Sequence, residues 1–212
     1  MNRNCKITVK NDPIPYLFFE DVFDQDALNK IWREFDYYKD NFENFFRHPR
    51  ETGSAGHTDI PNNMLTRKRG FFFHDVWHNP NHSSLSRMSQ EIFYKESMSH
   101  NESTYFRDFF PNEISILLSL YGNEDYYMPH KDATIATGCL WLYKEPKKWS
   151  GGKFRFVDFD LEFECNNNSM IVFPGGYQHE VTEIKMDEND FADGYGRYTI
   201  SYFMNVQRPM MQ

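Results

Sequence analysis

The sequence has few cysteines and no long apolar run, and each shortage excludes a class of protein. Its 3 cysteines, Cys5, Cys139 and Cys165, lie far apart in 212 residues and form no CxxC pair. Such spacing is typical of free thiols in a reducing compartment, so we expect a cytoplasmic protein without a disulfide framework. No run approaches the roughly 18 apolar residues that a membrane-spanning helix needs, and the opening MNRNCKITVKNDPIPY has no signal-peptide core. A membrane is therefore not an expected partner.

Positive charge is also scarce. Lysine and arginine number 23 against 31 aspartates and glutamates, which gives a net charge of −8. Broad electrostatic binding to nucleic acid needs an excess of cations, so this balance argues against a nucleic-acid partner, although it leaves a local basic groove open. We expect a peptide or small-molecule substrate instead.

Aromatic residues, in contrast, are abundant and make up 18% of the chain. In a mainly β protein they fill the space between sheets. A length of 212 residues suits one domain with a substantial core. We therefore predict a single domain over residues 1–212. About residues 1–110 would supply an entry strand, supporting helices and a loop, and about residues 112–208 would form the core.

The first half of the chain predicts helices that support this core. The apolar and aromatic segment 13–23 predicts an entry strand, and Asp24 after it is a candidate N-cap. Residues 25–40 carry one apolar helical face, formed by Leu28, Ile31, Trp32 and Phe35. A second helix is predicted over about 83–96. Between the two helices, residues 48–69 are rich in glycine, proline, asparagine and charge, which predicts a long loop that is functional or disordered.

After Asn112 the pattern changes to short β-rich runs separated by turn signals. The runs are ISILLSLY, DYYMPHKD, TGCLWLYK, KFRFVD, LEFEC, SMIVFP, HEVTEI and RYTISYFMN. Breaks such as Gly151-Gly152 and Pro174-Gly175-Gly176 fall where turns are needed. Eight short strands with helices in front predict a mainly β fold with flanking helices (α+β) and a double-stranded β-helix (jelly roll, cupin-like) core.

The segment His130-Lys131-Asp132 is the strongest candidate for a chemical site. Its histidine and aspartate are two residues apart, so on a strand their side chains point the same way. His179 opens a later strand and can face His130 if the sheets close into a barrel. Two imidazoles and one carboxylate are the ligands of an open octahedral iron(II) site, in which three positions stay free. Zinc accepts the same ligands, so the metal is left open at this point.

A second HxD segment, His57-Thr58-Asp59, shows that this motif alone is weak. It lies in the glycine- and proline-rich stretch with no strand around it, and we assign it to a surface loop or lid. Context favours His130: an aromatic strand precedes it, a second histidine follows on a later strand, and Arg197 opens the last strand. A planar guanidinium is well suited to bind a carboxylate beside such a site.

These segments, in this order, resemble the iron(II)/2-oxoglutarate-dependent dioxygenases, and most closely their prolyl 4-hydroxylase-like branch. The resemblance covers roughly residues 114–206 and runs through LYGNEDYYMPHKDA, TGCLWLY, GGKFRF, MIVFPGGYQHEV and GRYTISYF. The opening PIPYLFFEDVFDQDAL resembles the strand and helix at the start of that branch. Five ordered segments are more specific than any one motif.

Residue by residue, the resemblance implies that His130, Asp132 and His179 are catalytic iron ligands. It implies that Arg197 binds the distal carboxylate of 2-oxoglutarate and that Tyr121 lines the cosubstrate pocket. The implied cofactors are Fe(II), 2-oxoglutarate as cosubstrate, O2, and ascorbate as reductant. The implied reaction hydroxylates a peptidyl residue, proline before others, or a free amino acid, while 2-oxoglutarate is converted to succinate and CO2.

Two departures from the family pattern affect this interpretation. Arg197 follows His179 by eighteen positions, which is longer than usual in this branch, and the added MDENDFADGYG predicts an extended hairpin loop. Arg197 is preferred to Lys185, because RYTISYFMN alternates as a final strand should and Lys185 lies in or beside the insertion. Trp141 stands where many relatives have a tyrosine that helps to hold the carboxylate, and its indole N–H is an alternative donor.

Two other functions are compatible with the same ligands. A nucleobase demethylase of the same superfamily shares the HxD…H set and the terminal arginine, but the acidic balance argues against it. A jelly-roll binding module that holds a structural metal needs no enzymatic activity at all.

Overall fold

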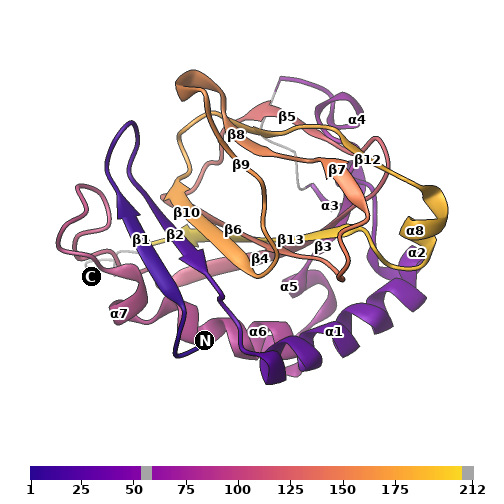
Figure 1. Ribbon diagram of the computed structural model, residues 1–212, viewed down its shortest axis with the longest axis horizontal. Helices are drawn as coiled ribbons and strands as arrows, with labels where there is room; N and C mark the ends of the chain where they lie inside the picture. Colours follow the sequence, from indigo (N-terminus) through magenta and orange to yellow (C-terminus); the bar gives the residue numbers. More distant parts are fainter. Residues whose placement is uncertain (54–58, 207–212) are drawn as a thin grey trace, which may run out of the picture.

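Two β-sheets face one another in the computed structural model, which describes residues 1–53 and 59–206, and helices cover the outer face of the larger sheet (Figure 1). The larger sheet has the strand order β1-β2-β10-β6-β13-β4-β3, and all its neighbours pair antiparallel. Its strands are β1 (Lys6–Lys10), β2 (Tyr16–Glu20), β3 (Arg69–Phe72), β4 (Glu113–Tyr121), β6 (Ala136–Leu142), β10 (Ser169–Pro174) and β13 (Arg197–Asn205).

The facing layer consists of shorter strands. Four of them pair in the order β5-β11-β8-β9, and β12 pairs with β7 beside them. Their bounds are β5 (Tyr127–His130), β7 (Trp149–Gly151), β8 (Phe154–Phe156), β9 (Leu161–Phe163), β11 (His179–Val181) and β12 (Ile184–Met186). A 3-10 turn, η3 (Val157–Phe159), joins β8 to β9.

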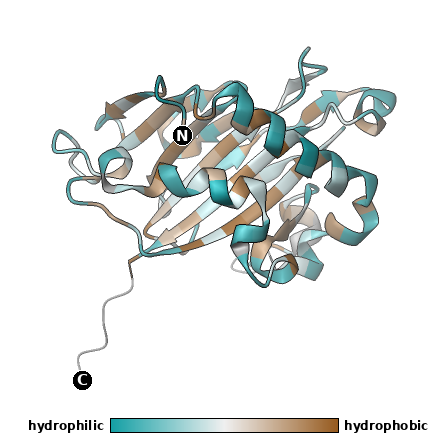
Figure 2. Ribbon diagram, turned by 90° about the horizontal axis from the view of Figure 1, so that it is seen from below, coloured by the Kyte–Doolittle hydropathy of each residue, from teal (hydrophilic) through white to brown (hydrophobic). Residues whose placement is uncertain are grey.

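The helices are short apart from the first, α1 (Gln25–Asp40). The others are α2 (Phe42–Phe45), α3 (Pro49–Thr52), α4 (Asn62–Leu65), α5 (Phe73–Val76), η1 (Pro80–His82), α6 (Ser84–Ser89), η2 (Gln90–Phe93), α7 (Lys95–Met98) and α8 (Glu188–Ala192). Figure 2 shows the covering helices with hydrophilic residues on their outer side. In the described part of the chain, no helix has the length and apolarity to cross a membrane.

Burial explains this layering. Every residue of β6 and of β10 is buried, because one face of each strand packs on the helices and the other on the smaller sheet. Helix α1 buries Ala27, Ile31, Phe35 and Tyr38, which recur at helical spacing on one side. The predicted mainly β jelly-roll core with flanking helices is confirmed, and so is the predicted helix over 25–40.

Other predictions for the first half were less accurate. The predicted helix over 83–96 is broken into α6, η2 and α7. The predicted loop over 48–69 contains α3 and α4, and part of it is buried, since Leu65 and Thr66 are 0% exposed. Strands β1 and β3 were not predicted. They extend the larger sheet at its two edges, so the first half of the chain contributes to that sheet directly.

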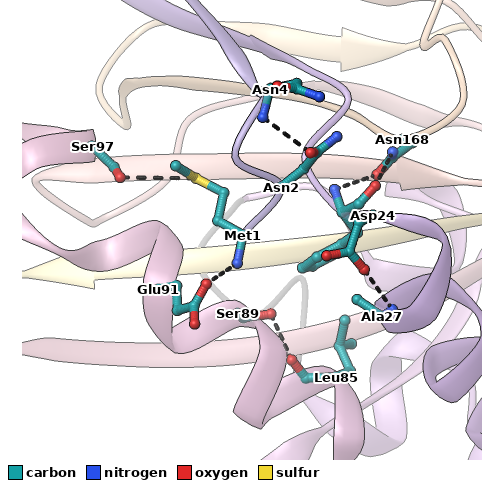
Figure 3. Close-up of polar contacts among 11 residues, drawn as sticks. Met1, Asn2, Asn4, Asp24, Ala27, Leu85, Ser89, Glu91, Ser97 and Asn168 are labelled. Carbon is teal, nitrogen blue, oxygen red and sulfur yellow. Dashed lines mark hydrogen bonds and ion pairs between the residues drawn. The ribbon is translucent and has the colours of Figure 1, made fainter.

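A buried asparagine ties the start of α1 to the sheet. Asn168 precedes β10 with a left-handed backbone (φ 58°). Its Oδ1 accepts a hydrogen bond from Phe23 N at 2.9 Å, and its Nδ2 donates to Phe23 O at 2.8 Å. Figure 3 shows Asn168 beside Asp24, the predicted N-cap, whose carboxylate accepts from Ala27 N at 2.9 Å. One side chain therefore satisfies both backbone groups of the residue that leads into the helix.

We expect Asn168→Ala to lower the free energy of unfolding by about 2–4 kcal/mol, because two buried backbone groups of Phe23 lose their partners. Urea denaturation measures the loss. Asn166→Ala is the matched control, since Asn166 lies exposed in the same turn and its loss should cost less than about 0.5 kcal/mol. Equal stabilities of the two variants would contradict this role.

Candidate metal centre

Three metal-ligating side chains converge where β5 meets β11. His130 Nε2 lies 3.9 Å from Asp132 Oδ1, and His179 Nε2 lies 3.6 Å from Asp132 Oδ2. The ligand atoms of all three residues lie within 4.8 Å of one another. Among the described residues, this is the only group of three or more histidine, cysteine, aspartate or glutamate side chains placed to hold a metal ion. The structure thus brings together the three residues selected from the sequence.

Strand register accounts for the convergence. His179 is the direct cross-strand partner of His130 in the antiparallel pair of β11 and β5. The turn before β11 fixes the third ligand, because Asp132 N donates to Gly175 O at 2.9 Å. A Cβ at Gly175 would lie 2.6 Å from Thr134 O, so this close approach requires glycine.

Backbone carbonyls orient both imidazole rings. Nδ1 of His130 lies 2.8 Å from Met128 O, and Nδ1 of His179 lies 2.9 Å from Tyr177 O. A carbonyl only accepts hydrogen bonds, so each Nδ1 carries the proton and each Nε2 lone pair points to the shared centre. Burial and the neighbouring His179 ring lower the pKa of His130 well below its usual range, which keeps this ring neutral as a metal ligand must be.

The carboxylate is oriented by a threonine pair. Thr137 Oγ1 donates to Asp132 Oδ2 at 2.6 Å, and Thr134 Oγ1 lies 3.0 Å from Thr137 Oγ1.

Aromatic rings pack against both histidines. Tyr127 stacks on His130 with centroids 3.6 Å apart and planes at 12°. The ring of His179 packs against three phenylalanines, Phe154, Phe156 and Phe173.

Arg197 lies at the start of β13 and is completely buried. Its cross-strand partner on β4 is Tyr121. The guanidinium carbon of Arg197 lies 4.4 Å from the ring centroid of Tyr121 and 5.7 Å from the ring centroid of Trp149. Nη1 donates to Gly152 O. Nε and Nη2 are buried and have no hydrogen-bond partner among the residues that the structure describes. Such groups are costly to bury unmatched, so Arg197 is suited to a planar anionic ligand.

One pocket borders the metal-ligating residues, and Arg197 lies next to it on the ring of Tyr121 without being one of the lining residues. Tyr121, Trp141 and Thr199 line this pocket together with the three ligands. Within the described part of the chain, Trp141 Nε1 and Thr199 Oγ1 are also buried without a partner. The unmatched indole and guanidinium groups are donors, and the hydroxyl can donate as well. A ligand rich in acceptors, such as a dicarboxylate, is therefore suited to the donors in and beside this pocket.

The insertion between His179 and Arg197 is more ordered than the predicted hairpin loop. Strand β12, which includes Lys185, ends at the first residue of the added stretch, and the added stretch forms the short helix α8. Lys185 is exposed and pairs with Ser150 in the register of β12 with β7, whereas Arg197 is completely buried. Strand β11 begins at His179 before the insertion, and strand β13 begins at Arg197 directly after it, as the sequence predicted.

Two residues of the site were not predicted. Thr137 lies within an apolar strand and gives no signal of its contact with Asp132. Lys68 lines the same pocket although it belongs to the predicted loop, where a lysine is normally solvated. The competing HxD segment falls mostly outside the described residues, which include Asp59 but not His57.

The fold and the three convergent side chains define a jelly-roll protein with a histidine–aspartate–histidine metal site. No family model matches the chain. Over 115 residues it is 30% identical to an uncharacterised PKHD-type hydroxylase of Synechocystis, a match that covers 45% of this chain and 37% of that protein. The chain therefore spans little more than a third of the length of this curated relative.

Solved structures extend the fold similarity to almost the whole chain. A Pseudomonas putida prolyl-4-hydroxylase is 12% identical with a TM-score of 0.53, over 91% of this chain and 93% of that one. The structure of OsALKBH1 is also 12% identical with a TM-score of 0.54, over 89% and 97% of the two chains. The resemblance seen in the sequence is confirmed: the chain is similar to a hydroxylase in sequence and to a prolyl hydroxylase in fold.

We expect Thr137→Val to weaken divalent metal binding by about 10–100-fold, because the carboxylate of Asp132 loses the donor that orients it. Isothermal titration with Mn(II) measures the affinity. Thr199→Val is the matched control, since Thr199 lines the same pocket without contacting Asp132 and should leave the affinity unchanged. Equal losses in both variants would show that Thr137 does not act through the carboxylate.

Proposed function

We propose that this chain is an Fe(II)/2-oxoglutarate-dependent dioxygenase that hydroxylates a peptidyl residue, proline before others, or a free amino acid. His130, Asp132 and His179 would hold the iron. Arg197 would bind the distal carboxylate of 2-oxoglutarate, and Tyr121 would line the cosubstrate pocket. The observation that carries the proposal is the buried guanidinium of Arg197. Its Nε and Nη2 have no hydrogen-bond partner among the residues that the structure describes.

Each residue has a part in this reaction. The three ligands leave coordination positions free, which a closed structural site would not. Bound iron(II) would supply the activation of O2 that couples oxidation of 2-oxoglutarate to succinate and CO2 with hydroxylation of the substrate. The aromatic residues around the histidines exclude water from the centre. Ascorbate would serve as the reductant that keeps the iron in its ferrous form.

The peptidyl or amino-acid substrate is supported by the similarity to a PKHD-type hydroxylase and to a prolyl-4-hydroxylase. The net charge of −8 supports a substrate other than nucleic acid. Succinate release from Fe(II), 2-oxoglutarate and ascorbate, with and without proline-containing peptides or free amino acids, tests the activity. No succinate under any of these conditions would refute it.

We expect Arg197→Met to weaken 2-oxoglutarate binding by about 2–5 kcal/mol, roughly 30-fold or more, because the carboxylate loses a buried charged partner. Anaerobic titration of the Fe(II) protein measures it through the visible charge-transfer band of the chelate. Arg155→Met is the control, because the guanidinium of Arg155 already has an anionic partner in Glu180, 2.7 Å away. An unchanged affinity in Arg197→Met would exclude Arg197 as the anchor.

A further inference from the structure

Lys68 is a buried ammonium group beside the metal-ligating residues, and the proposed reaction has given it no role so far. It is 3% exposed and lines the same pocket as the three ligands. Nζ donates to Ser119 Oγ at 2.8 Å and lies 5.0 Å from the ring centroid of Tyr127. An ammonium group has three N–H donors, so the contact with Ser119 leaves two of them for a ligand. Burying such a charge without an anionic partner is costly.

Lys68 lines the pocket on one side of Tyr121, and Arg197 lies on the other side of that residue. On one side, Arg197 pairs with Tyr121 between β13 and β4. On the other side, Arg69 pairs with Leu120, which places Lys68 level with Tyr121 just before β3 begins. Neighbouring strands lie about 4.8 Å apart, so the backbones of the two cations are separated by about 10 Å. Two buried cations on opposite sides of one residue are suited to a ligand with a carboxylate at each end.

Lys68 is the cation closer to the metal ligands. The ring of Tyr127, next to Nζ of Lys68, also stacks on His130. Burial, the neighbouring imidazole and then the charge of Lys68 lower the pKa of His130. Arg197 lies instead over Tyr121 and toward the insertion. Burial lowers the pKa of Lys68 itself to about 8, so the ammonium form still predominates near neutral pH.

We propose that Lys68 binds the oxo-acid end of the cosubstrate, while Arg197 binds its distal end. This inference rests on the proposed function. A carboxylate that chelates the metal through one oxygen keeps a second oxygen that needs a donor, and Nζ of Lys68 supplies it from the wall of the pocket. Lys68 is thus a positioning residue for the cosubstrate, with Ser119 fixing the direction of its side chain.

Comparing two ligands distinguishes contacts with one end of the cosubstrate from contacts with the other. 2-Oxovalerate has the oxo-acid end of 2-oxoglutarate but lacks the distal carboxylate. We expect Lys68→Met to weaken binding of both compounds to the anaerobic Fe(II) protein by a similar factor, about 10–100-fold. Arg197→Met should weaken binding of 2-oxoglutarate alone. The charge-transfer band reports the Fe(II) complexes, and calorimetry with Mn(II) in place of Fe(II) reports the same affinities without chemistry.

The double variant provides a second measurement. Contacts with opposite ends of 2-oxoglutarate should give additive losses in Lys68→Met/Arg197→Met, whereas contacts with one carboxylate should not. Lys10→Met, which removes an exposed lysine at the end of β1, is the matched control and should bind both ligands like the original protein. Unchanged melting temperature and Mn(II) affinity in Lys68→Met show that the fold and the metal site are intact.

The outcomes are distinct. A loss for 2-oxoglutarate alone, or non-additive losses, would place Lys68 at the distal carboxylate and overturn the proposal. No loss for either compound would overturn it as well and would assign Lys68 to another ligand or to the fold. If the unaltered protein formed no complex with 2-oxoglutarate, the proposed function itself would fail, a result that no Lys68 variant can produce.

Discussion

The register between β5 and β11 is the constraint on which the rest of the site depends. It sets His179 directly opposite His130, and a slip by one residue would turn His179 to the other face of the strand. Strand β8 holds β11 from its other edge, and the backbone contact of Gly175 with Asp132 locks the third ligand to the turn before β11. Ligands that lie far apart in the sequence therefore form one rigid unit before any metal binds.

The connection before Arg197 helps to hold the side chain of Arg197 in place. Strand β12 pairs with β7, and Trp149 of β7 lies beside the guanidinium of Arg197. Gly152, just after β7, accepts a hydrogen bond from Nη1, and a Cβ there would lie 3.1 Å from that nitrogen. The inserted residues thus support the wall against which Arg197 packs. These contacts explain how Arg197 can be buried at the start of β13 although the connection that leads to it is long.

Sequence patterns predicted the parts of the molecule in which a local rule and the tertiary structure agree. The helix over 25–40 has one apolar face. The expectation that His130 and Asp132 share a strand was wrong, because β5 ends at His130, and Asp132 is oriented by its contacts with Gly175 and Thr137 instead. Strand β3 was missed because its charged approach, TRKRG, resembles a loop, and its burial comes from pairing with a strand far along the chain. Burial of Lys68 has the same long-range origin. The roles of Arg197 and Tyr121 toward the cosubstrate stay predictions, although the structure pairs the two residues.

The polar lining of the pocket bears on the choice between an open catalytic site and a structural metal. A closed zinc site needs four protein ligands, and the described residues bring only three together. A structural metal would also leave the buried donors of Arg197 and Trp141 without a partner among the described residues, at a cost of about 1–3 kcal/mol for each unmatched group. A chelating dicarboxylate accounts for both features, because it completes the coordination sphere and accepts from these donors. The cations in and beside the pocket therefore favour an anionic ligand, and the three convergent side chains are suited to a metal with an open coordination sphere.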